Sequence, residues 1–203
     1  MLDRKSLAAA AMAVCCSLPV LGVPQTQAAT RARAGTAAVS EPAAVLAPAA
    51  VPAAAPARPR YGAVIAHIRI PRMGLKAKVR EGVGGSVLRR AVGHYPRTAL
   101  PGHEGNTVLL GHRTTHLRPF NRLDEMRRGD RIVLRVGRTS YVYKARSMHV
   151  IKPRNRSVLE PVPFKRRSAP DGEYVTLITC TPKGSDRRRL VVIGTLHHKK
   201  RVR

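Results

Sequence analysis

The chain has 203 residues, enough for one domain of ordinary size with additional segments. Its formal net charge is +27, and from residue 61 onward 32 Lys and Arg stand against nine Asp and Glu. A charge of this sign attracts nucleic acid, anionic lipid or an acidic cell-wall polymer. The basic residues are scattered and no zinc-finger or RNP-like motif accompanies them, which argues against specific nucleic-acid recognition as the main function.

Residues 1–30 have the layout of an export signal. Two basic residues precede an apolar stretch over 7–23, and the small residues Thr26 and Ala28 lie where a signal peptidase cleaves. The apolar stretch is at the short limit for a spanning helix, and Pro19 interrupts it. The pattern predicts a signal peptide or a signal anchor. It also predicts a location outside the cytoplasm, exported, anchored to the cell membrane or associated with the wall.

Residues 31–60 are rich in Ala and Pro. Repeated Pro favours extended geometry, so this segment is predicted to be a semi-rigid linker. The globular domain is predicted to span 61–198, and a basic tail is predicted at 199–203. A spacer between an export segment and a domain suits a protein that works beyond a membrane or within a wall.

The first half of the domain predicts strands with one helix. Residues 63–70 alternate as a strand does, 75–80 form a second strand, 86–92 a helical turn, and 107–110 a buried strand. Residues 120–128 carry large apolar side chains three apart and are followed by a glycine, which predicts a short amphipathic helix.

The second half predicts only strands. Residues 131–136 and 140–144 form a hairpin by spacing and composition, and 148–151 extend it. Residues 174–179 and 190–193 form the last two strands. Many short strands with few helices predict a mainly β fold and a closed or nearly closed barrel.

Cys180 is the only cysteine after residue 30. A disulfide within the domain is therefore impossible, and a zinc site built on several thiolates is excluded. The residue ends an apolar strand and precedes a loop with Pro182 and Gly184, a position that exposes a thiol. To attack an amide, the thiol needs a proton acceptor or a nearby positive charge.

His112 and Arg189 are the candidates for these roles. His112 also follows an apolar strand, so two strand ends at one rim can bring the imidazole to the thiol. Arg189 opens the last strand, and its guanidinium can donate to a developing oxyanion. Each residue has an ordinary interpretation as well: Cys180 as a core residue, His112 as loop polarity, and Arg189 as part of a solvated run over 187–189.

Three motifs together resemble the sortase family. Residues 106–113 read Asn-Thr-Val-Leu-Leu-Gly-His-Arg, 119–130 read Pro-Phe-Asn-Arg-Leu-Asp-Glu-Met-Arg-Arg-Gly-Asp, and 176–182 read Thr-Leu-Ile-Thr-Cys-Thr-Pro, with Arg189 following. Residues 93–102 and the pair Thr114-Thr115 are most similar to the class E enzymes of actinobacteria. The resemblance covers about 61–197.

The resemblance implies a fold and a reaction. The fold would be the sortase-type closed β-barrel of about eight strands with one or two short helices, and His112, Cys180 and Arg189 would take the family's catalytic positions. The cysteine would cleave a C-terminal sorting signal of LPxTG or LAxTG type between Thr and Gly and form a thioester. An amine of peptidoglycan or of a pilin would then resolve this acyl-enzyme.

The resemblance also implies the partners. They are secreted proteins that carry a sorting signal, the peptidoglycan or pilin amine acceptor, and the membrane through an uncleaved N-terminal segment. No cofactor and no metal are expected, because the acids are spread along the domain rather than clustered as in calcium-binding sortases.

Five residues are predicted to contact the substrate: Thr114, Thr115, His116, Thr179 and Thr181. His116 departs from the family pattern, because class E members often carry a Tyr there. That position is linked to the preference for LAxTG over LPxTG, so the second residue of the sorting signal stays open.

Two alternatives remain. An L,D-transpeptidase also uses Cys, His and Arg, but its cysteine usually lies in a Ser-x-Gly-Cys context that differs from Ile-Thr-Cys-Thr-Pro here. The other is a basic wall- or nucleic-acid-binding domain without catalysis, in which Cys180 is incidental. The reactivity of the Cys180 thiol separates this second alternative from an enzyme.

Overall fold

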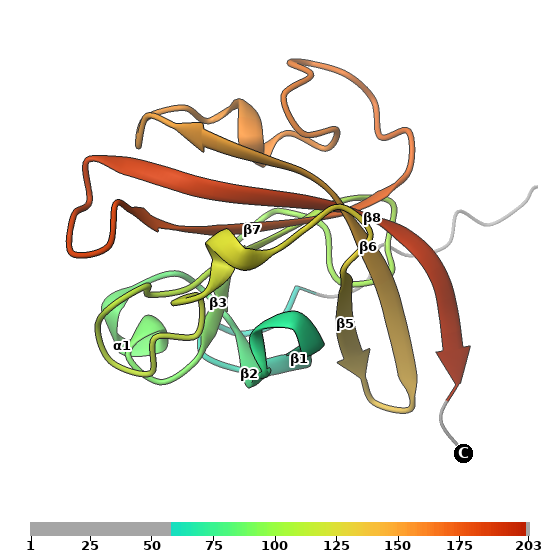
Figure 1. Ribbon diagram of the computed structural model, residues 1–203. Coiled ribbons are helices and arrows are strands. Elements are labelled where there is room, and N and C mark those ends of the chain that lie inside the picture. Colours follow the sequence, from blue (N-terminus) through green and yellow to red (C-terminus); the bar gives the residue numbers. More distant parts are fainter. Residues whose placement is uncertain (1–57, 202–203) are drawn as a thin grey trace, which may run out of the picture. The chain divides into compact units, whose positions relative to one another are not determined.

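Short strands dominate the domain, as their alternating apolar residues predict. The computed structural model describes residues 58–201, in which eight strands close into one barrel in the order β1-β2-β3-β4-β7-β8-β6-β5 (Figure 1). The strands are β1 (Val64–Ile70), β2 (Leu75–Glu81), β3 (Val92–His94), β4 (Gly105–Leu110), β5 (Arg131–Val136), β6 (Thr139–Ile151), β7 (Glu173–Thr181) and β8 (Arg188–Arg201). The predicted class, mainly β with a closed barrel, is confirmed.

Two strand pairs are parallel and the rest are antiparallel. β2 pairs parallel with β3, and β4 pairs parallel with β7. β6 is one strand of 13 residues where the sequence predicted two pieces. β8 pairs along its length with β6 as far as Arg201, so residues 199–201, predicted as a basic tail, belong to the last strand.

Helix is limited to single turns in the part of the chain that the structure describes. These turns are α1 (Gly85–Leu88), η1 (Pro71–Met73), η2 (Leu123–Glu125) and η3 (Ser157–Leu159). The helical turn predicted over 86–92 corresponds to α1, which ends earlier. The amphipathic helix predicted over 120–128 is wrong, because only the three residues of η2 are helical.

The reason lies in where the backbone donors of this segment bond. Phe120 N donates to His112 O at 3.1 Å, and Gly129 N donates to Ala145 O at 2.8 Å. Arg127 N donates to a carboxylate oxygen of Asp130. These partners replace the bonds of a regular helix. Leu123 and Met126 are buried nevertheless. The three-residue spacing of the apolar side chains therefore indicated that they are buried, not that the segment is helical.

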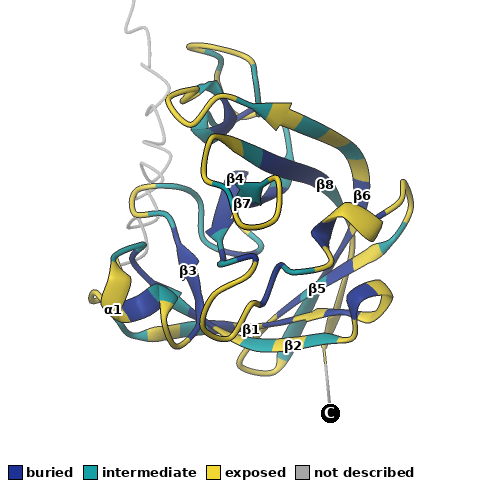
Figure 2. Ribbon diagram, turned by 60° about the vertical axis from the view of Figure 1, so that its left-hand side comes forward, coloured by how far each residue is buried: buried dark blue, intermediate teal, exposed yellow. Residues whose placement is uncertain are grey.

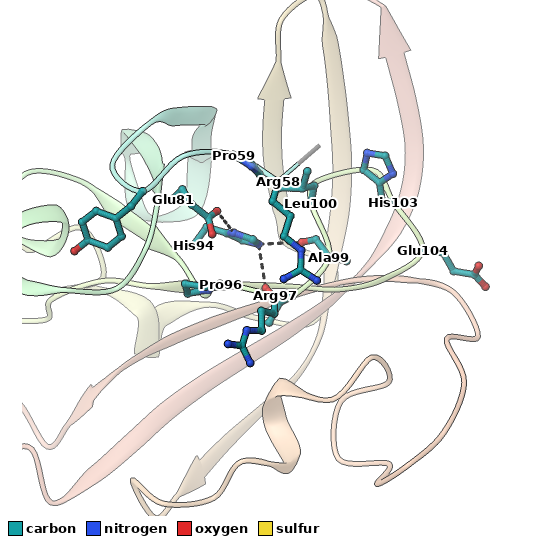
Figure 3. Close-up of a pocket in the computed structure, with 12 residues that line it drawn as sticks. Arg58, Pro59, Glu81, His94, Pro96, Arg97, Ala99, Leu100, His103 and Glu104 are labelled. Atoms are coloured by element: carbon teal, nitrogen blue, oxygen red, sulfur yellow. Dashed lines mark hydrogen bonds and ion pairs between the residues drawn. The ribbon is translucent and has the colours of Figure 1, made fainter. Parts of the chain in front are cut away.

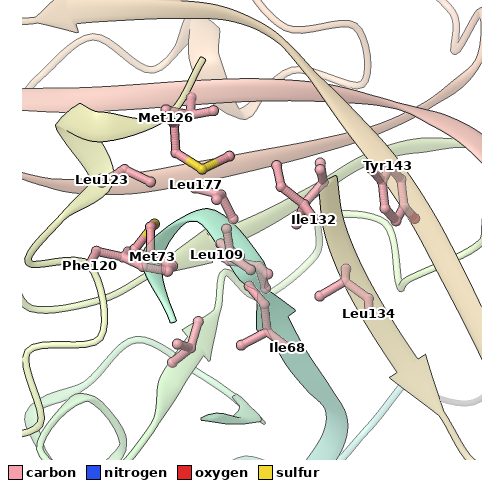
Figure 4. Close-up of a cluster of buried hydrophobic side chains, with 14 of the residues drawn as sticks. Ile68, Met73, Leu109, Phe120, Leu123, Met126, Ile132, Leu134, Tyr143 and Leu177 are labelled. Carbon is pink, nitrogen blue, oxygen red and sulfur yellow. The ribbon is translucent and has the colours of Figure 1, made fainter. Parts of the chain in front are cut away.

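The interior of the barrel is filled by aliphatic side chains, as the composition requires. On β1, Ala66, Ile68 and Ile70 point inward, whereas His67 and Arg69 between them are exposed. Figure 4 shows side chains from several strands meeting at the centre. The labelled ones are Ile68, Met73, Leu109, Phe120, Leu123, Met126, Ile132, Leu134, Tyr143 and Leu177.

A second, smaller cluster lies on the outer face of the barrel. Its buried members are Val108, Val158, Ile178, Val191 and Ile193. These come from β4, β7, β8 and the turn η3, so the connection between β6 and β7 covers the outer face of the sheet here.

The predicted export signal and nearly all of the predicted linker lie outside residues 58–201. Within residues 58–201, no helix has the length and apolar character needed to cross a membrane. The assignment of residues 1–30 as a signal peptide or anchor therefore stays a prediction.

Truncating the centre of the core is expected to destabilise the domain. Leu177→Ala should lower the free energy of unfolding by about 2–5 kcal/mol, because Leu177 is fully buried and would leave a cavity. Leu117→Ala is the control, since Leu117 is 63% exposed and should change the value by less than about 0.5 kcal/mol. Chemical denaturation measures both, and equal losses would contradict the assignment of the core.

Candidate active site

Three adjacent strands bring the predicted catalytic residues into one row. β4 and β7 run parallel with Leu110 opposite Ile178, so His112, two residues later, extends beside Cys180. β7 and β8 run antiparallel with Cys180 opposite Arg189. The order across the row is therefore His112, Cys180, Arg189.

The row lies on the outer face of the barrel. Along β7, Val175 and Leu177 point into the core, so Thr176, Ile178 and Cys180 point outward. Cys180 is half-buried, with its sulfur in no disulfide. Two residues further along the ladder on the same face, the paired residues Ile178 and Val191 are apolar, and both belong to the outer cluster. The thiol thus stands at the end of an apolar floor.

The ends of β4 and β7 are locked together beyond their last ladder pair. Gly111 N donates to Ile178 O at 3.1 Å, and the Thr179 hydroxyl donates to Gly111 O at 2.7 Å. A side chain at Gly111 would collide with Phe120 and Pro119, because a Cβ there would lie 2.8 Å and 2.9 Å from their ring atoms. Glycine at this position lets the chain turn directly after β4 and holds His112 at the rim.

Arg113 is a site residue that the sequence reasoning missed. Its side chain is buried at 5% exposure, and Nη1 donates to Cys180 O at 3.3 Å and to the Thr181 hydroxyl at 2.9 Å. Nη2 pairs with Asp124 at 3.0 Å. Nε finds no partner among the described residues. The guanidinium therefore ties the end of β4 to the backbone of the nucleophile candidate from the inner side of the barrel.

His112 is held partly out of water. Burial is the larger cause that lowers the pKa of His112 below its ordinary value, and the nearby His116 is the second. The two rings lie with their centroids 4.9 Å apart and tilted by 54°. Two imidazoles this close disfavour a second positive charge, so the free site favours a neutral His112.

Arg189 is placed opposite Cys180 by its backbone, but its guanidinium points elsewhere. Nη1 donates to Asp186 O at 2.6 Å and to Arg188 O at 3.1 Å, both in or beside the loop between β7 and β8. No hydrogen bond joins the Arg189 guanidinium to the side chain of His112 or Cys180 within residues 58–201. A role at the reacting carbonyl therefore requires the side chain to rotate toward the row.

The five predicted substrate residues fall into two groups. Thr114, Thr115 and His116 are exposed on the loop after His112. Thr179 is buried and its hydroxyl donates to Gly111 O, and the Thr181 hydroxyl accepts from Arg113. The first group is open to a ligand beside His112, whereas the second is engaged in holding the strand ends.

Asn106 is a second residue that the sequence did not single out. Its side chain is 2% exposed, and Nδ2 donates to Val158 O at 2.9 Å and to Glu160 O at 3.0 Å. Its Oδ1 accepts from the Thr176 hydroxyl at 2.7 Å. Asn106 therefore fastens the connection between β6 and β7 to the strands that carry His112 and Cys180. The available signal was its place as the first residue of the 106–113 motif.

A separate cavity of about 510 Å³ lies on another part of the barrel and contains none of the three candidates. Glu81 Oε2 and His94 Nδ1 meet there at 2.6 Å (Figure 3). His94 Nε2 lies 3.0 Å from both Ala99 O and the Thr98 hydroxyl. Both ring nitrogens thus have partners within the protein, and none is left for a substrate. No group of three or more His, Cys, Asp or Glu able to hold a metal occurs among residues 58–201.

The sequence and the fold of the domain match known proteins. The sortase domain family matches residues 68–197. Sortase SrtE1 of Streptomyces coelicolor is 36% identical over 143 residues, which cover 66% of this chain and 41% of that protein. The chain therefore spans less than half the length of this relative.

Solved structures agree with this match. Sortase SrtA of Actinomyces oris superimposes with a TM-score of 0.69 at 30% identity, covering 71% of this chain and 86% of that one. Sortase E1 of Streptomyces coelicolor, solved with a tripeptide in the active site, superimposes with a TM-score of 0.64 at 34% identity, covering 69% and 91%. The fold and the site together define a class of proteins: closed β-barrels that carry a cysteine at the end of a strand. The chain belongs to the sortase family, as the motifs predicted.

Removing His116 is expected to raise the pKa of His112. His116→Asn takes away the neighbouring imidazole, which lowers the pKa of His112, and part of its cover, so His112 should hold its proton to a higher pH than in the parent chain. An NMR titration of the His112 ring measures this, with His103→Asn as a matched control because His103 is exposed and follows a different strand. A His112 pKa that stays constant or falls would contradict the coupling.

Replacing Arg113 is expected to loosen the nucleophile's strand. Arg113→Gln should lower the free energy of unfolding by about 1–3 kcal/mol, because Cys180 O loses its buried donor. Arg122→Gln is the control: it breaks an exposed pair with Glu125 and should cost less than about 1 kcal/mol. Denaturant unfolding compares the two, and equal costs would remove Arg113 from the site.

Proposed function

We propose that this protein is a cysteine transpeptidase that acts on a C-terminal sorting signal of LPxTG or LAxTG type. The observation that carries the proposal is the row of His112, Cys180 and Arg189 across three adjacent strands, at the end of an apolar floor. Membership of the sortase family and the tripeptide in the active site of a relative support a peptide substrate.

The proposed reaction begins with the thiolate of Cys180. It attacks the carbonyl carbon of the Thr–Gly bond and forms a tetrahedral oxyanion. His112, as imidazolium, donates its proton to the leaving Gly nitrogen as the C–N bond breaks, which leaves a thioester on Cys180. An incoming amine attacks the thioester carbonyl, His112 takes the amine proton, and the thiolate leaves.

The charge state of this pair follows from the surroundings of His112. Burial and His116 disfavour its imidazolium in the free site, whereas a thiolate beside it favours that form. Formation of the ion pair is therefore coupled: losing the thiol proton and gaining the imidazole proton support each other. Arg189, once turned toward the row, would donate to the oxyanion.

The peptide would lie along the rim beside the row of His112, Cys180 and Arg189. Ile178 and Val191 are buried behind Cys180 under the connection that Asn106 fastens, and this packed cluster would form one border of the binding surface. We assign Thr114, Thr115 and His116 to the neighbouring wall, because they are exposed directly after His112. Thr179 and Thr181 would act indirectly, by fixing the strand ends through Gly111 and Arg113.

The location and partners complete the proposal. Residues 1–30 would export the chain or anchor it to the membrane, and residues 31–60 would act as a spacer before the domain. The substrates would be secreted proteins with a sorting signal, and the acceptor would be an amine of peptidoglycan or of a pilin. The competing function is a basic wall- or nucleic-acid-binding domain without catalysis.

Substituting the nucleophile is expected to abolish turnover. With the purified full-length chain, Cys180→Ala and His112→Ala should each lower the cleavage of fluorogenic LAxTG and LPxTG peptides by about 10³-fold or more. His103→Ala, which changes an exposed histidine in another loop, should leave the rate within about twofold. Mass spectrometry after reaction with a vinyl sulfone should locate the label on Cys180.

Two results would count against this function. Cleavage that persists in Cys180→Ala would mean that another group is the nucleophile. A Cys180 that reacts no faster than free cysteine, together with no cleavage of either peptide, would favour the non-catalytic basic domain.

A further inference from the structure

A cationic surface covers the barrel on the outer faces of β1, β2 and β5. Five exposed basic side chains project there: His67 and Arg69 from β1, Lys76 and Lys78 from β2, and Arg135 from β5. We call this set the cationic cleft, because the five residues line a hollow of about 820 Å³.

The strand register arranges these side chains as a grid. Lys78, His67 and Arg135 are directly paired across three strands. Two residues further along the strands, Lys76 is paired with Arg69. Neighbouring strands are about 4.8 Å apart, and alternate residues of one strand are about 7 Å apart. The basic side chains are therefore spaced closely enough to contact successive charges of one chain-like ligand.

No acidic side chain balances the cleft. Glu81 is the only acid in β1, β2, β5 and β6, and it is buried against His94. None of the ion pairs within residues 58–201 involves a residue of the cationic cleft. Charge of one sign that gathers in a concave surface concentrates the field and attracts counter-ions.

The cleft faces away from the proposed catalytic row. In the closed strand order, β1 is four strands from β7 in either direction, so its outer face points to the opposite side from that of Cys180. Figure 2 shows β1 and β2 at the lower edge of the barrel, with β7 and β8 above them. A ligand in the cleft would leave the Cys180 face open.

We propose that the cationic cleft binds a flexible linear polymer of phosphodiester units. Such a chain supplies one negative charge per unit and can follow a grid of cations without base-specific contacts. Bound in this way, the domain is held on the polymer with the row of His112, Cys180 and Arg189 turned outward. This inference concerns a surface distinct from the proposed active site and does not depend on the proposed reaction.

Two other polyanions fit the cleft less well. A membrane-binding surface combines cations with projecting apolar anchors, and the lining of the cleft has no exposed large apolar side chain. Single-stranded nucleic acid is bound through aromatic side chains on which bases stack, and no Phe, Tyr or Trp lines this cleft. The observations favour phosphates on a flexible chain without bases.

The test removes three cations from the cleft and compares an equal charge loss elsewhere. The test variant of the full-length chain is Arg69→Gln/Lys76→Gln/Lys78→Gln. The control is Arg89→Gln/Arg90→Gln/Arg128→Gln, three exposed arginines outside the cleft. Both variants lose the same net charge, so a difference between them reports position. The thermal midpoint confirms that each is folded.

The probe is a synthetic poly(glycerol phosphate), with vesicles of 30% phosphatidylglycerol and single-stranded DNA as the competing ligands. The test variant should lose about tenfold or more in affinity for the polymer, and its log–log salt slope should fall by about 2, whereas the control should stay within about threefold of the parent. Equal losses in both variants, or none in either, would overturn the proposal. Vesicle or DNA binding that depends on the cleft more than polymer binding would overturn it as well.

Discussion

The parallel pairing of β4 with β7 is the constraint on which the site depends. Because the two strands run in the same direction, their carboxyl ends reach the same rim, and the residues just beyond Leu110 and Ile178 lie side by side. The Thr179 hydroxyl on Gly111 O and the Arg113 guanidinium on Cys180 O hold those ends in register. The antiparallel pairing of β8 then adds the third member of the row.

Because side chains alternate along each strand, the inner and outer faces of the barrel carry different residues. Inward residues such as Ile68 and Leu177 build the core, which fixes the backbone of every strand. Some outward residues pack in the smaller cluster, and the others carry different chemistry on opposite sides: a thiol and an imidazole beside that cluster at β7, and basic side chains without ion pairs in the described residues at β1 and β2. One backbone arrangement thereby presents two surfaces on opposite sides of the barrel.

The electrostatics of the site follow from the same geometry. His112 follows a strand end and has His116 beside it, so its proton is held less firmly than in water. Arg113, on the inner side, brings a buried positive charge to the carbonyl of the thiol-bearing residue. In the proposed reaction, a thiolate on Cys180 would favour the imidazolium form of His112 that burial and His116 otherwise disfavour.

The sequence by itself determined most strand positions, because alternation and apolar runs are local, but it missed β3 (Val92–His94) and the full lengths of β6 and β8. It also picked out His112, Cys180 and Arg189 by motif and by their places at strand ends. Only the tertiary structure decided the parallel register, the true state of residues 120–128, the parts taken by Arg113 and Asn106, and the gathering of cations on β1, β2 and β5. The physical reason is that each of these depends on a partner strand or loop that is distant in the sequence, and the local pattern of one segment does not say which other segment it contacts.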